Sequence, residues 1–388
     1  MSPSRCAGLL WRAVAHRRTV VALTGRLREL TGHSHAVLTG SGRAALRLAL
    51  ESLGAGPGTE VVLSTFNCTA VADAVLATGA RPVLVDFDLA GGPDFTSAQL
   101  RGRPVIFTNG LGLDEWARHA GPVREGGGLP VLDLAQAAPA PETLIRYAGV
   151  GCPVVLSFGE GKQLGGAGGG ALLLSPEGEV PSSGPGGRAT LRPLARELDR
   201  YALQLAPQGV RAAVERRARQ SVGWSHTKAS HLPNEAGEVK VAEPSRWESA
   251  AAAALLASAS TVRAGALAHD AYVRTALDGQ LSGAEFVPST PDLIGGIELL
   301  FARRGERHRF AGALAAQGVP STWNYYPLHR TGPYAEFASG PMPGADHVWP
   351  RVLSVPKRPQ PRLTGKLLVD ALLAADRALY GREAATHD

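Results

Sequence analysis

A glycine-rich turn near the N-terminus has the residue types of an anion site. Gly40-Ser41-Gly42-Arg43-Ala44 leads into a stretch whose apolar residues recur at helical spacing. The free N–H groups and the dipole at the start of a helix bind phosphate well. A plain turn from a strand into a helix explains the same residues equally well.

A carboxylate follows the apolar run Leu129–Leu132, in the segment Asp133-Leu134-Ala135-Gln136. At the end of a buried strand it would face the crevice in which ligands bind. A pyridine-type cofactor needs such a carboxylate to keep its ring nitrogen protonated, because the pyridinium withdraws electrons from the reacting carbon. An Asp that caps the start of a helix would give the same pattern.

Lys162 stands in a glycine-rich segment that begins at Ser157 and runs to Gly170. Ser157 ends an apolar strand, and its hydroxyl can donate to a phosphate. A lysine in a partly dry site beside other cations loses proton affinity and becomes a usable amine nucleophile. Most lysines are solvated, so Lys162 taken alone fits a surface loop as well.

The order of these segments favours one shared site. Asp133 follows the glycine turn by about 90 residues, and Ser157 and Lys162 follow Asp133 by about 25 to 30 residues, all at the ends of expected strands. The ends of parallel strands are where such sheets collect their ligands. Together the segments indicate an aromatic, phosphorylated cofactor.

The elements that must position these residues are short strands alternating with helices. Strands are expected at 60–63, 82–86, 105–108, 130–134, 153–158 and 170–174, and helices at 43–53, 69–78, 189–220, 247–266 and near 364–380. Short strands separated by helices predict a three-layer α/β/α fold with a mostly parallel sheet. We expect residues 1–245 to form a large domain and residues 246–388 a smaller α+β domain.

Composition and charge exclude several other classes of protein. The net charge of +6 comes from scattered basic residues, without a nucleic-acid-binding motif, so we expect no nucleic acid partner. Three cysteines are too few for a disulfide framework or a cysteine-based metal site. The apolar run Ala250–Ala257 is short for a membrane span, and basic residues from Arg12 to Arg18 interrupt a signal peptide. These features predict a cytoplasmic protein with no membrane partner.

The chain resembles the DegT/StrS family of sugar aminotransferases, which are fold type I pyridoxal phosphate enzymes. The resemblance runs from about residue 24 to 381. It is clearest in TGSGRAALRLALESLGAGPGTEVVLS (39–64), VADAVLATGARPVLVDFD (71–88), LPVLDLAQA (129–137) and LSFGEGKQLGGAGGGALLL (156–174). A weaker similarity follows in WNYYPLHRTGPY (323–334) and RVLSVPKRP (351–359).

The resemblance implies pyridoxal 5′-phosphate as the cofactor and assigns roles by position. Lys162 would hold the cofactor as a Schiff base and then move a proton between the substrate Cα and the cofactor. Asp133 would pair with the pyridinium nitrogen, and Gln136 would lie near the ring hydroxyl. Cys68 stands where the family usually has an aromatic residue that stacks on the ring.

The resemblance also implies a phosphate site and a substrate site. Ser157 and the amides of Gly42, Arg43 and Ala44 would hold the phosphate, with Arg43 replacing the usual Thr. The substrate would be approached by residues from the C-terminal half, namely His329, Tyr326 and Arg246. We expect a homodimer in which the 221–246 segment reaches the neighbouring subunit, although the family's Asn-x-Arg segment has no clear match here.

The reaction implied by the resemblance is transamination. A small-molecule amino donor such as glutamate would pass its amino group to a keto acceptor, which would be a ketosugar or an intermediate of a specialised pathway. Another pyridoxal phosphate reaction, such as an elimination, a decarboxylation or a condensation, is an alternative. A cofactor-binding regulator without turnover is a second alternative. A nicotinamide-dependent dehydrogenase is poorly matched, because no expected strand precedes a G-x-G-x-x-G turn.

Overall fold

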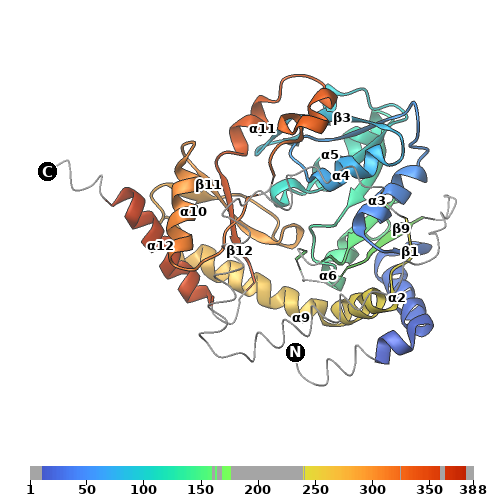
Figure 1. Ribbon diagram of the computed structural model, residues 1–388, viewed down its shortest axis with the longest axis horizontal. Helices are drawn as coiled ribbons and strands as arrows, with labels where there is room; N and C mark the ends of the chain where they lie inside the picture. The colour runs from blue at the N-terminus through green and yellow to red at the C-terminus, as the bar shows by residue number, and fades with distance from the viewer. Residues whose placement is uncertain are drawn as a thin grey trace.

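Two sheets and one long helix organise the chain (Figure 1). The computed structural model describes residues 11–159, 162–163, 168–175, 239, 241–323, 325–358 and 363–381. The loop expected at 176–188, the helical stretch expected at 189–220, and residues 221–238 and 240 of the expected crossing segment lie outside the described residues.

The large sheet has seven strands in the order β1-β9-β8-β7-β6-β2-β3. They are β1 (His35–Thr39), β2 (Glu60–Ser64), β3 (Arg81–Val85), β6 (Pro104–Phe107), β7 (Leu129–Asp133), β8 (Val154–Ser157) and β9 (Gly170–Leu174). All pairs from β3 to β8 are parallel, whereas β9 is antiparallel to both β8 and β1. The prediction of a mostly parallel sheet is confirmed.

Apolar residues cover both faces of this sheet, because successive side chains of a strand point to opposite sides. In β2, Val61 and Leu63 belong to one buried cluster and Val62 belongs to the other. Helices α3 (Gly42–Glu51) and α4 (Thr69–Leu76) pack on the first face. Helices α2 (His16–Thr31), α5 (Glu115–Glu125) and α6 (Pro141–Leu144) pack on the second. The expected three-layer arrangement is therefore confirmed.

A small antiparallel sheet lies toward the C-terminus. Its strands are β10 (Ala284–Phe286), β11 (Gly296–Phe301) and β12 (Val352–Pro356), in that order. Helices α10 (Glu306–Ala316) and α12 (Gly365–Tyr380) share a separate apolar cluster with it. Helix α12 is the closing helix that the sequence predicted.

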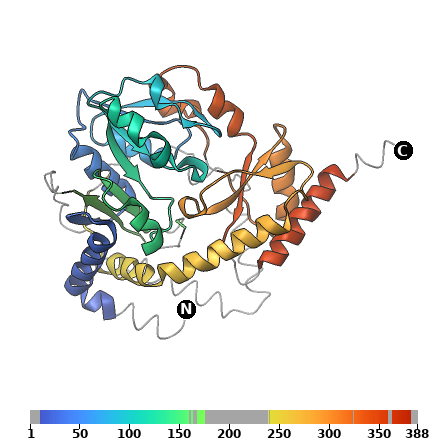
Figure 2. The ribbon, with the colours of Figure 1, turned by 180° about the vertical axis from the view of Figure 1, so that it is seen from behind.

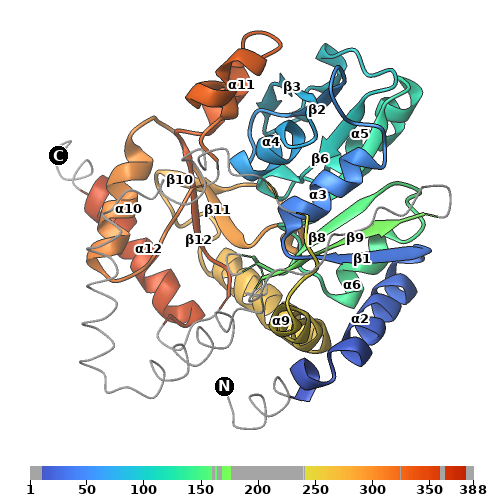
Figure 3. The ribbon, with the colours of Figure 1, turned by 45° about the vertical axis from the view of Figure 1, so that its right-hand side comes forward.

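The long helix α9 (Arg246–Ala276) runs past both sheets (Figures 2 and 3). A capping box starts it, in which Ser245 and Glu248 each bind the other's backbone N–H. Its 31 residues give a length of roughly 46 Å, ten residues beyond the expected end at 266. Ala252 and Leu256 pack with the large sheet, and Val273 packs with the small one.

Among the described residues, α9 is the one helix whose length and apolar composition would allow it to cross a membrane. The sequence showed only the short apolar run Ala250–Ala257, whereas the folded helix extends the apolar segment over Arg246–Ala276. Length and composition alone are weak support for a span, since core helices of globular proteins meet the same criterion.

Residues that follow the expected domain boundary at residue 246 pack against the large sheet as well as the small one. The first half of α9 packs on the large sheet, and so do Leu328, Tyr334 and Val348 from the C-terminal half. Helix α11 (Pro343–Val348) accordingly lies beside β3 in Figure 1, away from α12. The division into 1–245 and 246–388 stays a prediction.

Candidate active site

The ends of four strands bring candidate residues to one edge of the large sheet. Ser157 at the end of β8 and Thr39 at the end of β1 both pair with Gly170 at the start of β9. Asp133 ends the neighbouring strand β7. Two adjacent cavities open at this edge, and the residues that line both are Cys68, Val71, Asp133, Ala135 and Lys162.

The second cavity ends at the start of α3, where a phosphate was expected. Ser41 caps this helix, and its Oγ accepts a hydrogen bond from the Ala44 N–H at 3.1 Å. A Cβ on Gly42 would lie 2.8 Å from the Ser157 Cβ, so only glycine allows this approach. Ser41, Gly42 and Ser157 all line the cavity, whereas the Ala44 amide serves the helix cap. The capping role of Ser41 was not predicted from the sequence, although Ser is a favoured cap residue.

Arg43 adds a cation to the same end of the cavity. Its Nη1 lies 3.7 Å from Oδ2 of Asp73, which is 9% exposed. Oδ1 of Asp73 accepts a hydrogen bond from the Tyr334 hydroxyl at 2.5 Å. Asp73 therefore sits between a tyrosine from the C-terminal half and the guanidinium at the helix start.

Asp133 is buried at the junction of the two cavities, with 6% of its surface exposed. Its Oδ1 accepts the Ala135 N–H at 2.8 Å. No helix follows directly, since α6 begins at Pro141, so the helix-cap alternative is wrong. Burial raises the pKa of Asp133, while the Ala135 N–H and the Lys162 ammonium act to lower it. The carboxylate is thus held in a dry site within the field of Lys162.

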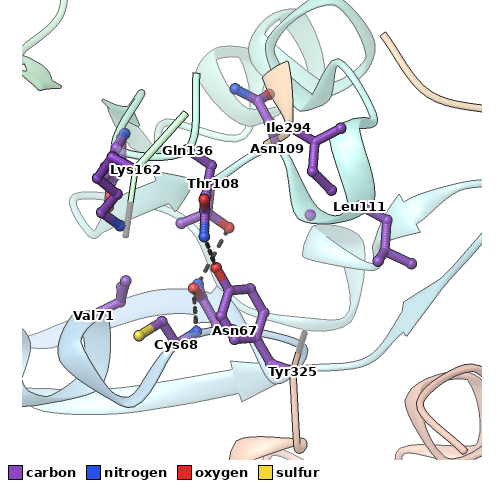
Figure 4. Close-up of a pocket in the computed structure, with 13 residues that line it drawn as sticks. Asn67, Cys68, Val71, Thr108, Asn109, Leu111, Gln136, Lys162, Ile294 and Tyr325 are labelled. Atoms are coloured by element: carbon purple, nitrogen blue, oxygen red, sulfur yellow. Dashed lines mark hydrogen bonds between the residues drawn. The ribbon is translucent and has the colours of Figure 1, made fainter. Parts of the chain in front are cut away.

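Lys162 lines both cavities and is partly buried. Its backbone N–H donates to the Gly159 carbonyl at 3.2 Å, which closes a turn directly after Ser157. Figure 4 shows its side chain at the same cavity as Cys68 and Tyr325. The alternative of a solvated surface lysine does not describe this position.

Tyr325 forms the wall of the first cavity, a role that sequence analysis gave to no residue. Its hydroxyl accepts a hydrogen bond from Gln136 Nε2, and burial raises its pKa. Tyr326, which was expected near the substrate, instead packs its ring on Trp349 with centroids 4.9 Å apart. Nothing in the spacing of Tyr325 distinguishes it from its neighbour.

A strained loop after β6 closes the first cavity. Asn109 and Leu111 adopt positive φ angles of 55° and 53°, which non-glycine residues rarely do. Glu115, fully buried, accepts the N–H groups of Thr108 at 2.8 Å and Gly110 at 2.7 Å. This loop was not predicted from the sequence, although a strand followed by Asn-Gly-Leu-Gly is a turn signal.

Neighbouring polar residues complete this wall. Asn67 is buried and donates through Nδ2 to Thr108 Oγ1 at 3.2 Å. Its Oδ1 accepts the N–H of Cys68 at 2.8 Å. Burial raises the pKa of the Cys68 thiol, so the cavity presents a neutral sulfur at the position expected to contact the ring.

His329 and Arg246 lie outside the residues that line the two cavities, as Tyr326 does. His329 contacts Thr65 Oγ1 through Nδ1 at 2.8 Å and Asp346 Oδ1 through Nε2 at 3.0 Å. Arg246 is exposed at the first position of α9. A substrate role for these three residues stays a prediction.

No cluster of three or more His, Cys, Asp or Glu side chains suited to a metal ion occurs within the described part of the chain. The two cavities present an amine, a buried carboxylate, hydroxyl groups and a helix start.

Part of the chain is similar in sequence to known proteins. Residues 13–93 match the DegT/DnrJ/EryC1/StrS aminotransferase family. The chain is 34% identical over 170 residues to the UDP-N-acetyl-3-dehydro-alpha-D-glucosamine 3-aminotransferase of Acidithiobacillus ferrooxidans, covering 41% of this chain and 45% of that protein. It is 31% identical over 162 residues to the 3-amino-5-hydroxybenzoate synthase of Amycolatopsis mediterranei, covering 39% and 42%. The similarity thus spans less than half the length of these curated relatives.

Solved structures match over almost the whole chain. A DegT DnrJ EryC1 StrS aminotransferase from Brucella abortus covers 97% of this chain, and 96% of its own chain is matched, with a TM-score of 0.67 and 20% identity. A 3-amino-5-hydroxybenzoic acid synthase covers 98%, with 97% of its chain matched, a TM-score of 0.69 and 18% identity. At such identities the agreement concerns the fold. The chain is thus similar in sequence to the DegT/DnrJ/EryC1/StrS aminotransferase family over residues 13–93, and its fold is similar to that of these two solved structures over almost its whole length.

Proposed function

We propose that this protein is a pyridoxal phosphate-dependent aminotransferase. The observation that carries the proposal is that Lys162 and Asp133 line the same two cavities, one of which ends at the start of α3 beside Ser157. An amine, a buried carboxylate and an anion-binding helix start are the groups that this cofactor requires.

The described residues fit the cofactor at both of its ends. At the phosphate end, the missing Cβ of Gly42 leaves the Ser157 hydroxyl beside the first turn of α3, and Arg43 adds a positive charge. At the ring end, Asp133 uses Oδ1 for the Ala135 N–H, which holds the carboxyl group in a fixed orientation at the cavity. Cys68 and Gln136 line the space between them and Tyr325.

Bound pyridoxal phosphate supplies an electron-poor ring that stabilises negative charge at the substrate Cα. Asp133 would hold a proton on the ring nitrogen, since a charged carboxylate in a dry site strongly favours a cationic partner. The Lys162 Nζ would bind the cofactor covalently and, once released by substrate, would take and return the proton at Cα. Ser157 and the first turn of α3 would anchor the phosphate.

The substrates we propose are an amino acid donor, such as glutamate, and a cyclic keto acceptor. Relatives named above act on a keto derivative of a nucleotide sugar or make an aminohydroxybenzoate, so a ketosugar and a specialised-metabolite intermediate both remain candidates. We further propose a cytoplasmic homodimer in which the second subunit supplies residues to the site.

The test is the visible absorption spectrum of the purified protein with pyridoxal phosphate, before and after addition of glutamate. Transamination predicts a yellow protein that glutamate bleaches and a keto acid restores. Lys162→Ala should lose the visible band that depends on the lysine. A band that no amino donor changes would favour a cofactor-binding regulator, and bleaching with loss of carbon dioxide would indicate a decarboxylase.

A further inference from the structure

A short turn before β11 contacts three of the segments that line or adjoin the first cavity. The turn comprises residues 290–294 and includes the 3-10 helix Pro291–Leu293. Its Thr290 N–H donates to the Gly112 carbonyl at 2.8 Å, next to the strained loop. Its Asp292 carbonyl accepts the N–H of Ala138 at 2.9 Å, in the segment that follows Asp133. Ile294 lines the first cavity itself.

The third contact of the turn is with Gln163, the residue directly after Lys162. Gln163 is 5% exposed, and its Nε2 donates to the carbonyls of Asp292 at 3.2 Å and of Ile294. A longer contact of 3.4 Å joins the same nitrogen to the Pro291 carbonyl. The backbone at Lys162 is therefore tied to this turn by a buried side-chain amide.

Lys357 also donates hydrogen bonds to the same turn. It directly follows β12 and is 1% exposed, and its Nζ donates to the Pro291 carbonyl and, at 3.0 Å, to the Ile294 carbonyl. These two carbonyls also accept from Gln163. Lys357 and Gln163 thus share their acceptors, so a displacement of one changes the hydrogen bonds of the other.

Charged groups around the turn explain why a lysine is tolerated there. Asp292 forms a bidentate ion pair with Arg263 of α9, at 2.8 and 2.7 Å, and Asp270 pairs with Arg274 at 2.9 Å. Burial lowers the pKa of Lys357 to about 8, and the two carboxylates act to raise it. A buried cation is retained where it satisfies backbone acceptors that would otherwise be left without partners.

We propose that Lys357 is a positioning residue for Lys162, which it orients through the 290–294 turn and the Gln163 side chain. This inference rests on the proposed function, in which Lys162 carries the cofactor. Lys357 is not among the residues that line the two cavities. Its effect on the reaction would come from the shared carbonyl oxygens that fix the backbone beside Lys162.

The experiment compares the pyridoxal phosphate holoenzyme of the wild type with Lys357→Met, and with Lys366→Met as a control. Lys366 is an exposed lysine on α12. The readouts are cofactor content, the pH midpoint of the visible absorption band, and kcat and KM for glutamate. Lys357→Met removes the hydrogen bonds to the Pro291 and Ile294 carbonyls. Their loss should lower kcat about 10- to 100-fold, because small misplacements of reacting groups have effects of this size. It should also shift the pH midpoint of the band while the cofactor stays bound, and Lys366→Met should match the wild type.

A second variant tests the hydrogen bonds between Gln163 and the 290–294 turn. It also keeps the proposal testable if Lys357→Met does not fold. Gln163→Leu leaves Lys357 in place and removes the amide that ties Lys162 to the turn. It should shift the pH midpoint in the same direction, and the double variant should show an effect smaller than the sum of the two.

The outcomes separate the two proposals. A wild-type protein without a lysine-dependent visible band would overturn the proposed function. A wild type with that band, together with Lys357→Met and Gln163→Leu variants that keep the wild-type pH midpoint and kcat, would overturn the positioning role alone. A drop in thermal stability with an unchanged spectrum and kcat would likewise show that Lys357 is only structural.

Discussion

Gly42 and Ser157 lie in such close contact that a methyl group on Gly42 would sit 2.8 Å from the Ser157 Cβ and 3.0 Å from its Oγ. Gly42 is the first residue of α3 and Ser157 is the last residue of β8, 115 positions apart in the chain. Gly170 is equally confined, because a Cβ there would lie 2.6 Å from the Gly42 nitrogen. The end of the cavity where we place the phosphate is therefore closely packed around two glycines, Gly42 and Gly170.

This contact predicts the effect of Gly42→Ala. The added methyl group should push Ser157 and the start of α3 apart, at a cost of about 1–3 kcal/mol, and weaken pyridoxal phosphate binding at least about tenfold. Equilibrium dialysis of the cofactor and urea unfolding measure both effects. In Gly25→Ala the new methyl group meets no atom within 4 Å, so that variant should bind the cofactor normally.

Arg43 should contribute to phosphate affinity through its charge. Removing a charged hydrogen-bond donor typically costs about 1.5–3 kcal/mol, so Arg43→Ala should weaken cofactor binding about 10- to 100-fold. Inorganic phosphate should compete with pyridoxal phosphate less well in the variant than in the wild type. Arg18→Ala, at an exposed position of α2, is the control for the lost charge. Equal phosphate competition in wild type and Arg43→Ala would contradict the assignment.

Asp133→Asn should separate binding from chemistry. The amide keeps the shape of the carboxyl group but cannot stabilise a protonated ring nitrogen, so kcat should fall about 10- to 100-fold or more while the cofactor still binds. Stopped-flow absorbance with glutamate measures the first half-reaction directly. Asp278→Asn, on the exposed surface, should react at the wild-type rate. If Asp133→Asn reacted at the wild-type rate, the proposed catalytic role of Asp133 would be contradicted.

The buried carboxylate of Glu115 predicts a pH dependence of stability. Burial raises its pKa from 4.5 to about 7. The folded protein therefore binds more protons than the unfolded chain between these values, and the contribution of Glu115 to the free energy of unfolding falls by on the order of 3 kcal/mol as the pH rises through this window. Glu298, whose pKa is also raised to about 7 by burial, acts in the same direction.

Urea unfolding at several pH values between 4.5 and 7.5 checks this prediction. Glu115→Gln should show a shallower fall in stability over that range, because the contribution of the Glu115 carboxyl group is removed. The exposed residue Glu29 offers a control, since Glu29→Gln should retain the wild-type slope. A slope in Glu115→Gln identical to that of the wild type would contradict the assigned pKa.

The sequence predicts the large sheet and the centre of the site because both rest on local patterns. Apolar runs bounded by turn residues gave six strands to within a few residues, and β9 (Gly170–Leu174) was predicted to the residue. The positions of Asp133, Ser157 and Lys162 at strand ends follow from the same patterns. Parallel connectivity then forces these ends to one edge of the sheet.

The contacts that lie outside these patterns could not be predicted, because they join residues far apart in the chain. Tyr325 reaches Gln136, and Lys357 and Gln163 meet on one turn only once the small sheet has docked. Tyr325 and Tyr326 are adjacent and identical in type, so only tertiary packing decides which one faces the cavity. The strained backbone at Asn109 and Leu111 likewise depends on Glu115 being buried beneath it.

The most direct test of the account is to reduce the holoenzyme with sodium borohydride and to map the modified peptide by mass spectrometry. Reduction makes the bond between cofactor and protein permanent, and the account predicts one pyridoxyl phosphate group, on Lys162. Prior incubation with an amino donor should prevent the labelling, because the substrate amine takes the place of the lysine. Stable labelling of another lysine, or none on a protein that has bound the cofactor, would contradict the central claim.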